Sequence, residues 1–402
     1  MLSVPAELSI GTTPAAHFGA GAVARLPAVV TAAGGSTVLL VTDAALAATP
    51  VTGAVTSVLA AAGLPVTVFS GVHPNPTTGD LAAGAALAAG LLAASPVVVA
   101  VGGGSPIDAA KGIALAAVNP QRGRELDYRS DFAAPALPLV AVPTTAGTGA
   151  ETNAFGVVTD EAARRKFYVG HASTMPVAAI LDPDLTIGLP PGATAATGMD
   201  ALTHALESYL SVRANPWSAG LALQVIGMVG EFLPRAVADG TDREARGQLL
   251  LAAHMAGLAM ATTGLGACHA IGHALGGRFG VAHGVALTMV LPQVLSFSSP
   301  AVPGRLAEIA FALGAGSAAA AAIEAIAALA VSVGMNHRLS DFGIGTEHFE
   351  QIAADALDDE VLANAPLQPA ASDVAAMLAA AQGDLVKPKT FEPGRLKGLR
   401  AD

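Results

Sequence analysis

Five residues that can bind a divalent metal or transfer protons are concentrated in two short segments of the chain. His269, His273 and His283 lie within fifteen residues of one another, and Asp200 and His204 lie upstream. The pairs 200/204 and 269/273 are both spaced i and i+4, which places the two side chains of a pair on one helix face. A carboxylate and several imidazoles on facing helices can bind a divalent transition metal. These residues therefore predict metal chemistry, with all five as candidate ligands.

The alternative is that these are structural histidines, because an isolated Asp/His pair at this spacing often forms an ordinary hydrogen bond. We favour a metal because buried imidazoles in apolar, glycine-rich surroundings need polar partners. The helix with His269 and His273 is expected to end near 276–277, and His283 to lie at or near the start of the next helix. Cys268 would point elsewhere on its helix and is interpreted as a buried thiol. Glu207 could support a ligand from outside the metal site.

A glycine turn after a buried strand indicates a phosphate-binding site. The strand 97–101 leads into Gly102, Gly103, Gly104 and Ser105, and a helix follows. Glycines let the backbone approach an anion, and the N–H groups and dipole of a helix N-terminus favour negative charge. The turn matches neither the G-x-G-x-x-G fingerprint nor a P-loop. A tight strand–helix turn without a ligand is therefore the alternative.

A second loop, 143–151, follows another expected strand and offers Thr144, Thr145 and Thr148. Loops at the carboxyl ends of parallel strands bind ligands in α/β sheets, and these hydroxyls suit ribose and nicotinamide. Asp43 follows the first strand. Its carboxylate could accept hydrogen bonds from ribose hydroxyls and repel a 2′-phosphate, which favours NAD over NADP. The alternative role for Asp43 is a helix N-cap.

The elements that must position these residues change in type near 188–192. Before this point, β-branched runs at 38–41, 66–69, 97–101 and 137–142 alternate with Ala-rich helical stretches. Such alternation predicts an α/β domain whose parallel sheet has helices on both faces. After this point the pattern is helical throughout. We expect a dinucleotide-binding α/β domain at 1–189 and an all-helical metal-binding domain at 190–402.

Composition excludes several classes of partner. The 402 residues carry a net charge of −11, so nucleic acid and anionic membranes are poor partners. The uncharged stretch 81–104 is interrupted by Pro96 and is interpreted as a helix (79–94) and a strand (96–101), not as a membrane span. The single cysteine and the absence of a signal-peptide pattern predict a cytoplasmic protein. The basic segment 387–400 is interpreted as a solvated tail.

Taken in order, these motifs resemble the iron-dependent (group III) alcohol dehydrogenases. The resemblance is carried by the segments 17–23, 42–43, 74–77, 102–111, 143–151, 198–207 and 269–284. It implies the architecture shared with dehydroquinate synthase, in which the active site lies in the cleft between the α/β and helical domains. It also implies that Asp200, His204, His269 and His283 are the metal ligands. His273 would then be the histidine near the nicotinamide that relays the proton.

The resemblance also implies the remaining site residues. The cofactor-binding set is Asp43, Asn75, Gly102, Gly103, Gly104, Ser105, Asp108, Thr144, Thr145, Thr148 and Lys166. Phe155 and Met260 are assigned to the substrate pocket. Lactaldehyde-reductase-like members have Asn near the position of Phe155, and some relatives have an aromatic residue where this chain has Met260. Both differences favour an apolar pocket.

The implied activity is reversible hydride transfer between a primary alcohol or aldehyde and NAD(H), with NADP(H) as the alternative cofactor. One divalent metal is expected, Fe²⁺ in preference to Zn²⁺, in a homodimer or higher homo-oligomer. A reductase of a functionalised aldehyde, such as an oxoacid semialdehyde or phosphonoacetaldehyde, is an alternative in which Arg278 or Lys166 binds the anion. A dehydroquinate-synthase-like lyase would need several basic residues to hold a phosphorylated substrate. A metal-stabilised binding protein without catalysis is the remaining alternative.

Overall fold

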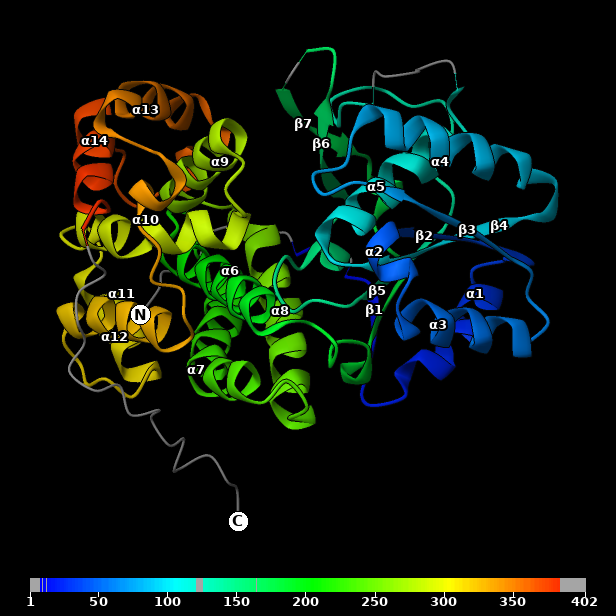
Figure 1. Cartoon of the computed structure of the whole chain (residues 1–402), viewed down its shortest axis with the longest axis horizontal. Coiled ribbons are helices and arrows are strands. Elements are labelled where there is room, and N and C mark those ends of the chain that lie inside the picture. The colour runs from blue at the N-terminus through cyan, green and yellow to red at the C-terminus, as the bar shows by residue number, and fades with distance from the viewer. Residues whose placement is uncertain (1–7, 9, 12, 121–125, 164, 384–402) are drawn as a thin grey trace. The chain divides into compact units, whose positions relative to one another are not determined.

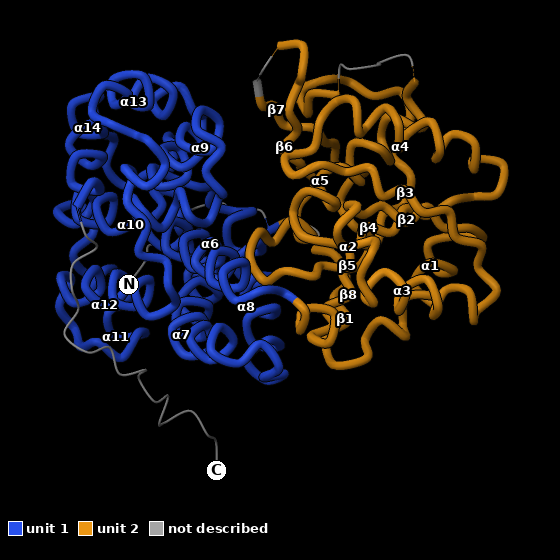
Figure 2. Tube along the Cα trace, viewed as in Figure 1, with its two compact units in different colours: residues 1–10, 189–402 blue, residues 11–188 orange. Residues whose placement is uncertain are grey.

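The computed structural model describes residues 8, 10, 11, 13–120, 126–163 and 165–383, which form two compact units (Figures 1 and 2). One unit is Gly11–Gly188. The other is formed by the described residues of Leu189–Asp402 with those of Met1–Ile10. The basic segment 387–400 lies outside the described residues.

The unit Gly11–Gly188 is built on a six-stranded parallel sheet with the strand order β1-β8-β5-β4-β2-β3. The strands are β1 (Ala15–Phe18), β2 (Thr37–Asp43), β3 (Val66–Val72), β4 (Pro96–Gly102), β5 (Leu139–Pro143) and β8 (Ala178–Leu181). Every residue of β4 is buried, because helices cover both faces of the sheet. The predicted parallel sheet is therefore confirmed.

Alternate side chains of the strands pack into two separate hydrophobic cores, one on each face of the sheet. Leu39 and Val98 face the core shared with α4 and α5, whereas Val38 and Val97 face the core shared with α1 and α3. The helices are α1 (Leu26–Ala32), α2 (Ala44–Ala47), α3 (Pro50–Ala61), α4 (Thr78–Gly90) and α5 (Gly104–Ala116). Figure 1 shows α4 and α5 on one side of the sheet and α1 and α3 on the other. The helix expected at 79–94 is α4 followed by a separate 3-10 turn, Leu92–Ala94.

Four strands of this unit were not predicted. β1 and β8 are four residues long, too short to show an alternating pattern. The strands β6 (Phe155–Asp160) and β7 (Arg165–Gly170) form an antiparallel hairpin outside the main sheet. The hairpin packs against α5. It matters for the site because it carries Phe155 and Lys166.

The regular elements of the second unit are all helices among its described residues, as predicted. Its α-helices are α6 (Pro191–Leu210), α7 (Pro216–Ala238), α8 (Arg243–Thr263), α9 (Ala267–Phe279), α10 (His283–Ser298), α11 (Pro303–Ala312), α12 (Ala319–Ser332), α13 (Phe349–Asp358) and α14 (Ala371–Ala380). The prediction that the His269 helix ends near 276–277 is wrong by a few residues. α9 continues through both glycines and ends at Phe279; the C-cap residue Gly280 has a φ of 67°, the left-handed conformation that glycine adopts easily.

One helix in the described part of the chain, α7, is long and apolar enough to cross a membrane by length and composition. Half of its most apolar window is buried inside the structure. α7 packs against both α6 and α8. Its apolar character is therefore accounted for by its place in the core of the helical unit.

Candidate metal centre and cofactor loops

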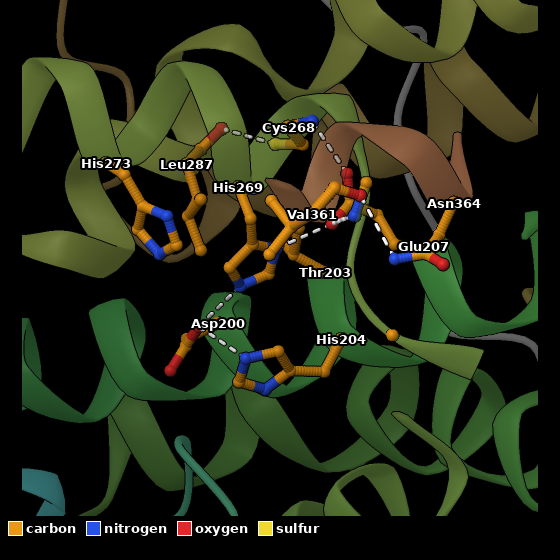
Figure 3. A network of polar contacts seen from close by, with 12 residues as sticks. Asp200, Thr203, His204, Glu207, Cys268, His269, His273, Leu287, Val361 and Asn364 are labelled. Atoms are coloured by element: carbon orange, nitrogen blue, oxygen red, sulfur yellow. Dashed lines mark hydrogen bonds and ion pairs between the residues drawn. The ribbon is translucent and has the colours of Figure 1, made fainter. Parts of the chain in front are cut away.

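Three helices of the second unit bring four potential ligands together. α6 carries Asp200 and His204 one turn apart, α9 carries His269, and α10 begins at His283. One donor atom from each of these residues lies within 4.8 Å of the other three. Figure 3 shows Asp200, His204 and His269 facing one another across the gap between α6 and α9. In the described residues this is the one group of its kind that could hold a metal ion.

The distances within this group fit a shared cation better than hydrogen bonds. Oδ1 of Asp200 lies 3.4 Å from Nε2 of His204, 3.5 Å from Nε2 of His283 and 3.8 Å from Nε2 of His269. Two ligand atoms that each lie about 2.1 Å from a tetrahedral ion are about 3.4 Å apart. Oδ1 of Asp200 and Nε2 of His269 are buried and have no hydrogen-bond partner among the described residues. A divalent cation would satisfy both atoms.

The electrostatics around Asp200 and His269 favour positive charge, whereas burial lowers the pKa of His283 to about 3 and keeps that imidazole neutral. Burial would raise the pKa of Asp200, but the imidazoles of His204 and His283 hold it well below its usual range. Burial lowers the pKa of His269, yet the carboxylates of Glu207 and Asp200 outweigh it and raise the pKa to about 9. The same negative carboxylates that raise the pKa of the buried His269 imidazole also favour a bound metal cation, which competes with the proton for the ring nitrogen.

Glu207 holds the far side of His269. Its Oε2 accepts hydrogen bonds from Nδ1 of His269 at 2.6 Å and from the backbone N–H of Gly266 at 2.9 Å. Its Oε1 accepts from the backbone N–H of Cys268 at 2.6 Å. The contact to Nδ1 leaves Nε2 of His269 as the nitrogen with a lone pair, facing Asp200. Cys268 is buried as predicted, and its Sγ contacts the carbonyl oxygen of Leu287.

His273 lies one turn after His269 but has a different partner. Its Nδ1 is 2.7 Å from Oδ2 of Asp359, whose Oδ1 accepts a hydrogen bond from the backbone N–H of Val361. The His273 ring stacks on that of His283 with a centroid distance of 5.6 Å, and its side chain is 26% exposed. Sequence reasoning missed Asp359, because nothing in an acidic run 86 residues further along the chain indicates a contact with His273.

The glycine turn and the threonine loop lie in contact at the carboxyl ends of β4 and β5. The backbone N–H of Thr144 donates to the carbonyl oxygen of Gly102 at 3.0 Å. A Cβ added at Gly103 would meet Oγ1 of Thr145 at 3.1 Å, and one at Gly104 would meet Cγ2 of Thr148 at 2.9 Å. The two loops therefore pack closely because the turn lacks side chains.

Two further predicted cofactor residues lie beside this turn. Asn75 adopts a φ of 57°, and its backbone N–H donates to Oγ of Ser105 at 3.3 Å. Nζ of Lys166, from the hairpin, donates to Oδ1 of Asn75 at 2.9 Å. Asp43 lies at the end of β2 and caps α2, because its Oδ1 accepts from the backbone N–H of Leu46 at 2.8 Å. The N-cap role considered for Asp43 is thus present in the structure.

The other predicted residues have the following positions. Asp108 lies in α5, and its Oδ2 accepts a hydrogen bond from the backbone N–H of Val157 at 3.0 Å. Phe155 begins β6 and is 47% exposed. Met260 lies near the end of α8 and is half-buried. Phe155 belongs to the Gly11–Gly188 unit and Met260 to the helical unit.

The comparisons with known proteins cover both units. The family model described as "Iron-containing alcohol dehydrogenase" matches residues 13–183, and "Fe-containing alcohol dehydrogenase family, C-terminal" matches residues 194–382. The chain belongs to the iron-containing alcohol dehydrogenase family. It is therefore an oxidoreductase of the alcohol dehydrogenase class, as the resemblance predicted.

Individual relatives match over nearly their whole length. The chain is 39% identical to "Probable alcohol dehydrogenase EutG" of Salmonella typhimurium over 369 residues, covering 92% of this chain and 93% of the relative. It is 36% identical to the NAD-dependent methanol dehydrogenase of Bacillus methanolicus over 372 residues, covering 91% and 97%. The solved structure of a 1,3-propanediol oxidoreductase matches with a TM-score of 0.88 and 35% identity, covering 92% of this chain and 98% of that one.

Proposed function

We propose that this alcohol dehydrogenase transfers hydride reversibly between a small primary alcohol, or its aldehyde, and NAD(H), with one divalent metal held by Asp200, His204, His269 and His283. The observation that carries the proposal is the convergence of three Nε2 atoms on Oδ1 of Asp200 at 3.4–3.8 Å. We take the unit Gly11–Gly188 as the dinucleotide-binding domain and the helical unit as the metal-binding domain.

We propose Fe²⁺ as the resident metal, with Zn²⁺ as the alternative. One carboxylate and three imidazoles suit either ion, and the family description supports iron. When bound, the cation supplies Lewis-acid chemistry that polarises an alcohol or carbonyl oxygen. Glu207 orients His269 for this role, because a carboxylate on the far ring nitrogen fixes the tautomer of a ligating histidine.

His273 is proposed to exchange the proton that accompanies hydride transfer. The contact of its Nδ1 with Asp359 at 2.7 Å favours a proton on Nδ1 in the neutral ring, so Nε2 is the nitrogen that accepts and returns a proton. Its partial exposure gives that proton a path to solvent. Asp359 keeps the ring in one orientation and stabilises the imidazolium when it forms.

NAD is proposed as the cofactor in preference to NADP. The glycine turn at 102–105 and the threonines of 144–148 would hold the pyrophosphate and the nicotinamide ribose, with Asn75, Asp108 and Lys166 beside them. Asp43 supports NAD because a carboxylate at the end of a strand repels a 2′-phosphate. The name of the NAD-dependent methanol dehydrogenase supports the same choice.

A small uncharged substrate is proposed over a functionalised, anionic aldehyde. Arg278, considered as an anion-binding residue, already forms an ion pair with Asp355, in which Nη2 lies 2.9 Å from Oδ1. Phe155 and Met260 are proposed to make the substrate pocket apolar. We also propose that the protein forms a homodimer or higher homo-oligomer. A cytoplasmic location is proposed as well, and the single cysteine supports it because disulfide bonds are rare in reducing compartments.

The test is a substrate panel with NADH and NADPH on protein stripped of metal and reloaded anaerobically with Fe²⁺ or Zn²⁺. Oxidation of NADH by short aldehydes only after reloading would support the proposal. His204→Ala should abolish metal binding, whereas His337→Ala, in the same unit but away from these ligands, should not. A metal-loaded protein that consumes no NADH with any aldehyde would overturn the proposal.

A further inference from the structure

Lys111 is a fully buried cation in α5 to which the proposed function assigns no role. Its Nζ donates to the carbonyl oxygen of Ala150 at 2.7 Å, to Oδ1 of Asn153 at 3.0 Å and to the carbonyl oxygen of Phe155. A lysine ammonium has three N–H donors, and these three acceptors use all of them. All three acceptors lie in one stretch of six residues, 150–155.

Asp108, one turn earlier in α5, holds the next residues of the same stretch. Its Oδ2 accepts from the backbone N–H of Val157, and its Oδ1 lies 3.7 Å from Nζ of Lys111. Gly156 packs so closely on the helix that an added Cβ would lie 2.9 Å from Cα of Asp108. The segment 150–157 is therefore held on α5 by two neighbouring side chains, the fully buried Lys111 and the partly exposed Asp108.

This segment directly continues the threonine loop. Gly149, with a φ of 59°, joins 144–148 to Ala150, so the position of Ala150 sets where that loop ends. Thr148, just before Gly149, contacts the start of α5, because a Cβ added at Gly104 would lie 2.9 Å from Cγ2 of Thr148. Thus α5 holds the glycine turn at its N-terminus and the end of the threonine loop through Lys111, two turns further along.

An apolar side chain would fill the position of Lys111 without the cost of burying a charge. Burial lowers the pKa of Lys111 to about 8, against the opposing effect of the Asp108 and Glu151 carboxylates. Burying a lysine at this position therefore costs more free energy than burying an apolar side chain of similar size. What it adds is three directed hydrogen bonds that fix main-chain and side-chain acceptors in one arrangement.

We propose that Lys111 is a positioning residue for the nicotinamide dinucleotide. By fixing the segment 150–157 on α5, it sets the spacing between the glycine turn at 102–105 and the threonine loop at 144–148. This inference rests on the proposed function, in which those two loops hold the cofactor. Lys111 acts through the loop and does not itself contact the cofactor.

The test compares Lys111→Met with Asn119→Ala in the full-length, metal-loaded enzyme. Asn119 is a matched control, because it is also fully buried, near the other end of α5, where its Nδ2 holds the carbonyl oxygens of Leu115 and Ala134, both at 2.9 Å. Lys111→Met should raise the Kd and KM for NADH about tenfold or more, which corresponds to about 1.4 kcal/mol. Because the loop is needed in ground and transition states alike, kcat at saturating NADH should change by less than about threefold.

Hydrogen exchange supplies a readout independent of turnover. In Lys111→Met the amides of Phe155 and Val157 should exchange faster, while the helical amides of α5 should keep their protection. If Lys111→Met does not fold, Asn153→Ala removes one of the three acceptors with the charge retained and should raise the Kd for NADH by a smaller factor.

The outcomes separate this inference from the one on which it rests. Wild-type protein that fails to bind NADH would reject the proposed cofactor site itself. If the wild type binds NADH and the Lys111 and Asn153 variants bind it equally well, the positioning role is wrong. Equal weakening by Asn119→Ala would also overturn it, because the effect would then be general destabilisation.

Discussion

Replacing Glu207 with Gln should weaken metal binding without removing any proposed ligand. The carboxylate accepts three hydrogen bonds, from Nδ1 of His269 and from the backbone N–H groups of Gly266 and Cys268, at 2.6–2.9 Å. Glutamine has nearly the same shape, but its amide nitrogen donates. One of the three donors must then face another donor inside a buried site.

The size of the effect follows from these contacts. Loss of one hydrogen bond to a charged acceptor costs about 1.5–3 kcal/mol. Losing a partner that orients a metal-ligating histidine typically lowers metal affinity about 10- to 100-fold, or about 1.4–2.7 kcal/mol. The two estimates agree, so we expect Glu207→Gln to raise the metal Kd by a factor in this range.

The assay is competition with a chelator of known affinity, run with Zn²⁺ and anaerobically with Fe²⁺, together with the melting temperature of metal-free and metal-loaded protein. Glu244→Gln is the control, because the Glu244 side chain is 65% exposed and its ion pair with Arg235 lies at the surface, where such pairs are worth about 0–1 kcal/mol. The control should bind metal as the wild type does.

A folded Glu207→Gln variant whose metal Kd equals that of the wild type would refute the reasoning. It would mean that the orientation of His269 does not depend on Glu207, or that His269 is not a ligand. Measuring His269→Ala alongside distinguishes these cases, since loss of a true ligand should weaken binding more than loss of its partner.

Three further predictions concern the proton path, the cofactor and pH. His273→Ala should lower kcat by roughly 10²- to 10⁴-fold with metal content unchanged, and Asp359→Asn should lower it by a smaller factor; metal loss in His273→Ala would contradict the proposed role. Asp43→Ser keeps a side chain able to cap α2 but removes the negative charge, so kcat/KM with NADPH should rise with little change in melting temperature; unchanged NADPH use would count against a selective role. Burial lowers the pKa of Lys111 from 10.5 to about 8, so the unfolded chain binds more protons than the folded chain between these pH values. The contribution of Lys111 to the free energy of unfolding should therefore rise with pH across that window, by about 3 kcal/mol. Denaturant titrations should show this rise in the wild type and not in Lys111→Met.

Local spacing was enough to predict much of this protein. The i and i+4 pairs placed Asp200 with His204, and His269 with His273, on helix faces because helical geometry alone determines those directions. The fully apolar run before Gly102 predicted a buried parallel strand, and the glycines after it predicted a turn into a helix N-terminus, with a bound phosphate or as a tight turn without a ligand. Both features follow from backbone geometry within a few residues, so no knowledge of the tertiary structure was needed.

Longer connections were visible only in the folded chain. The hairpin β6–β7 was missed, although it carries Phe155 and Lys166 and packs on α5. The anchoring of that region by Lys111 was likewise not foreseen, since its acceptors lie 39 to 44 residues further along. Such contacts depend on how helices and strands pack, which local spacing does not specify.

The division between His269 and His273 shows the same limit at the metal centre. By spacing the two residues are equivalent, one turn apart on one helix, and only the family resemblance separated their roles. In the folded chain Nε2 of His269 faces Asp200 and its Nδ1 is held by Glu207, whereas Nδ1 of His273 is held by Asp359. The sequence determined that both histidines share a helix face. Tertiary structure decided which carboxylate each one meets, because those carboxylates arrive on other elements of the fold.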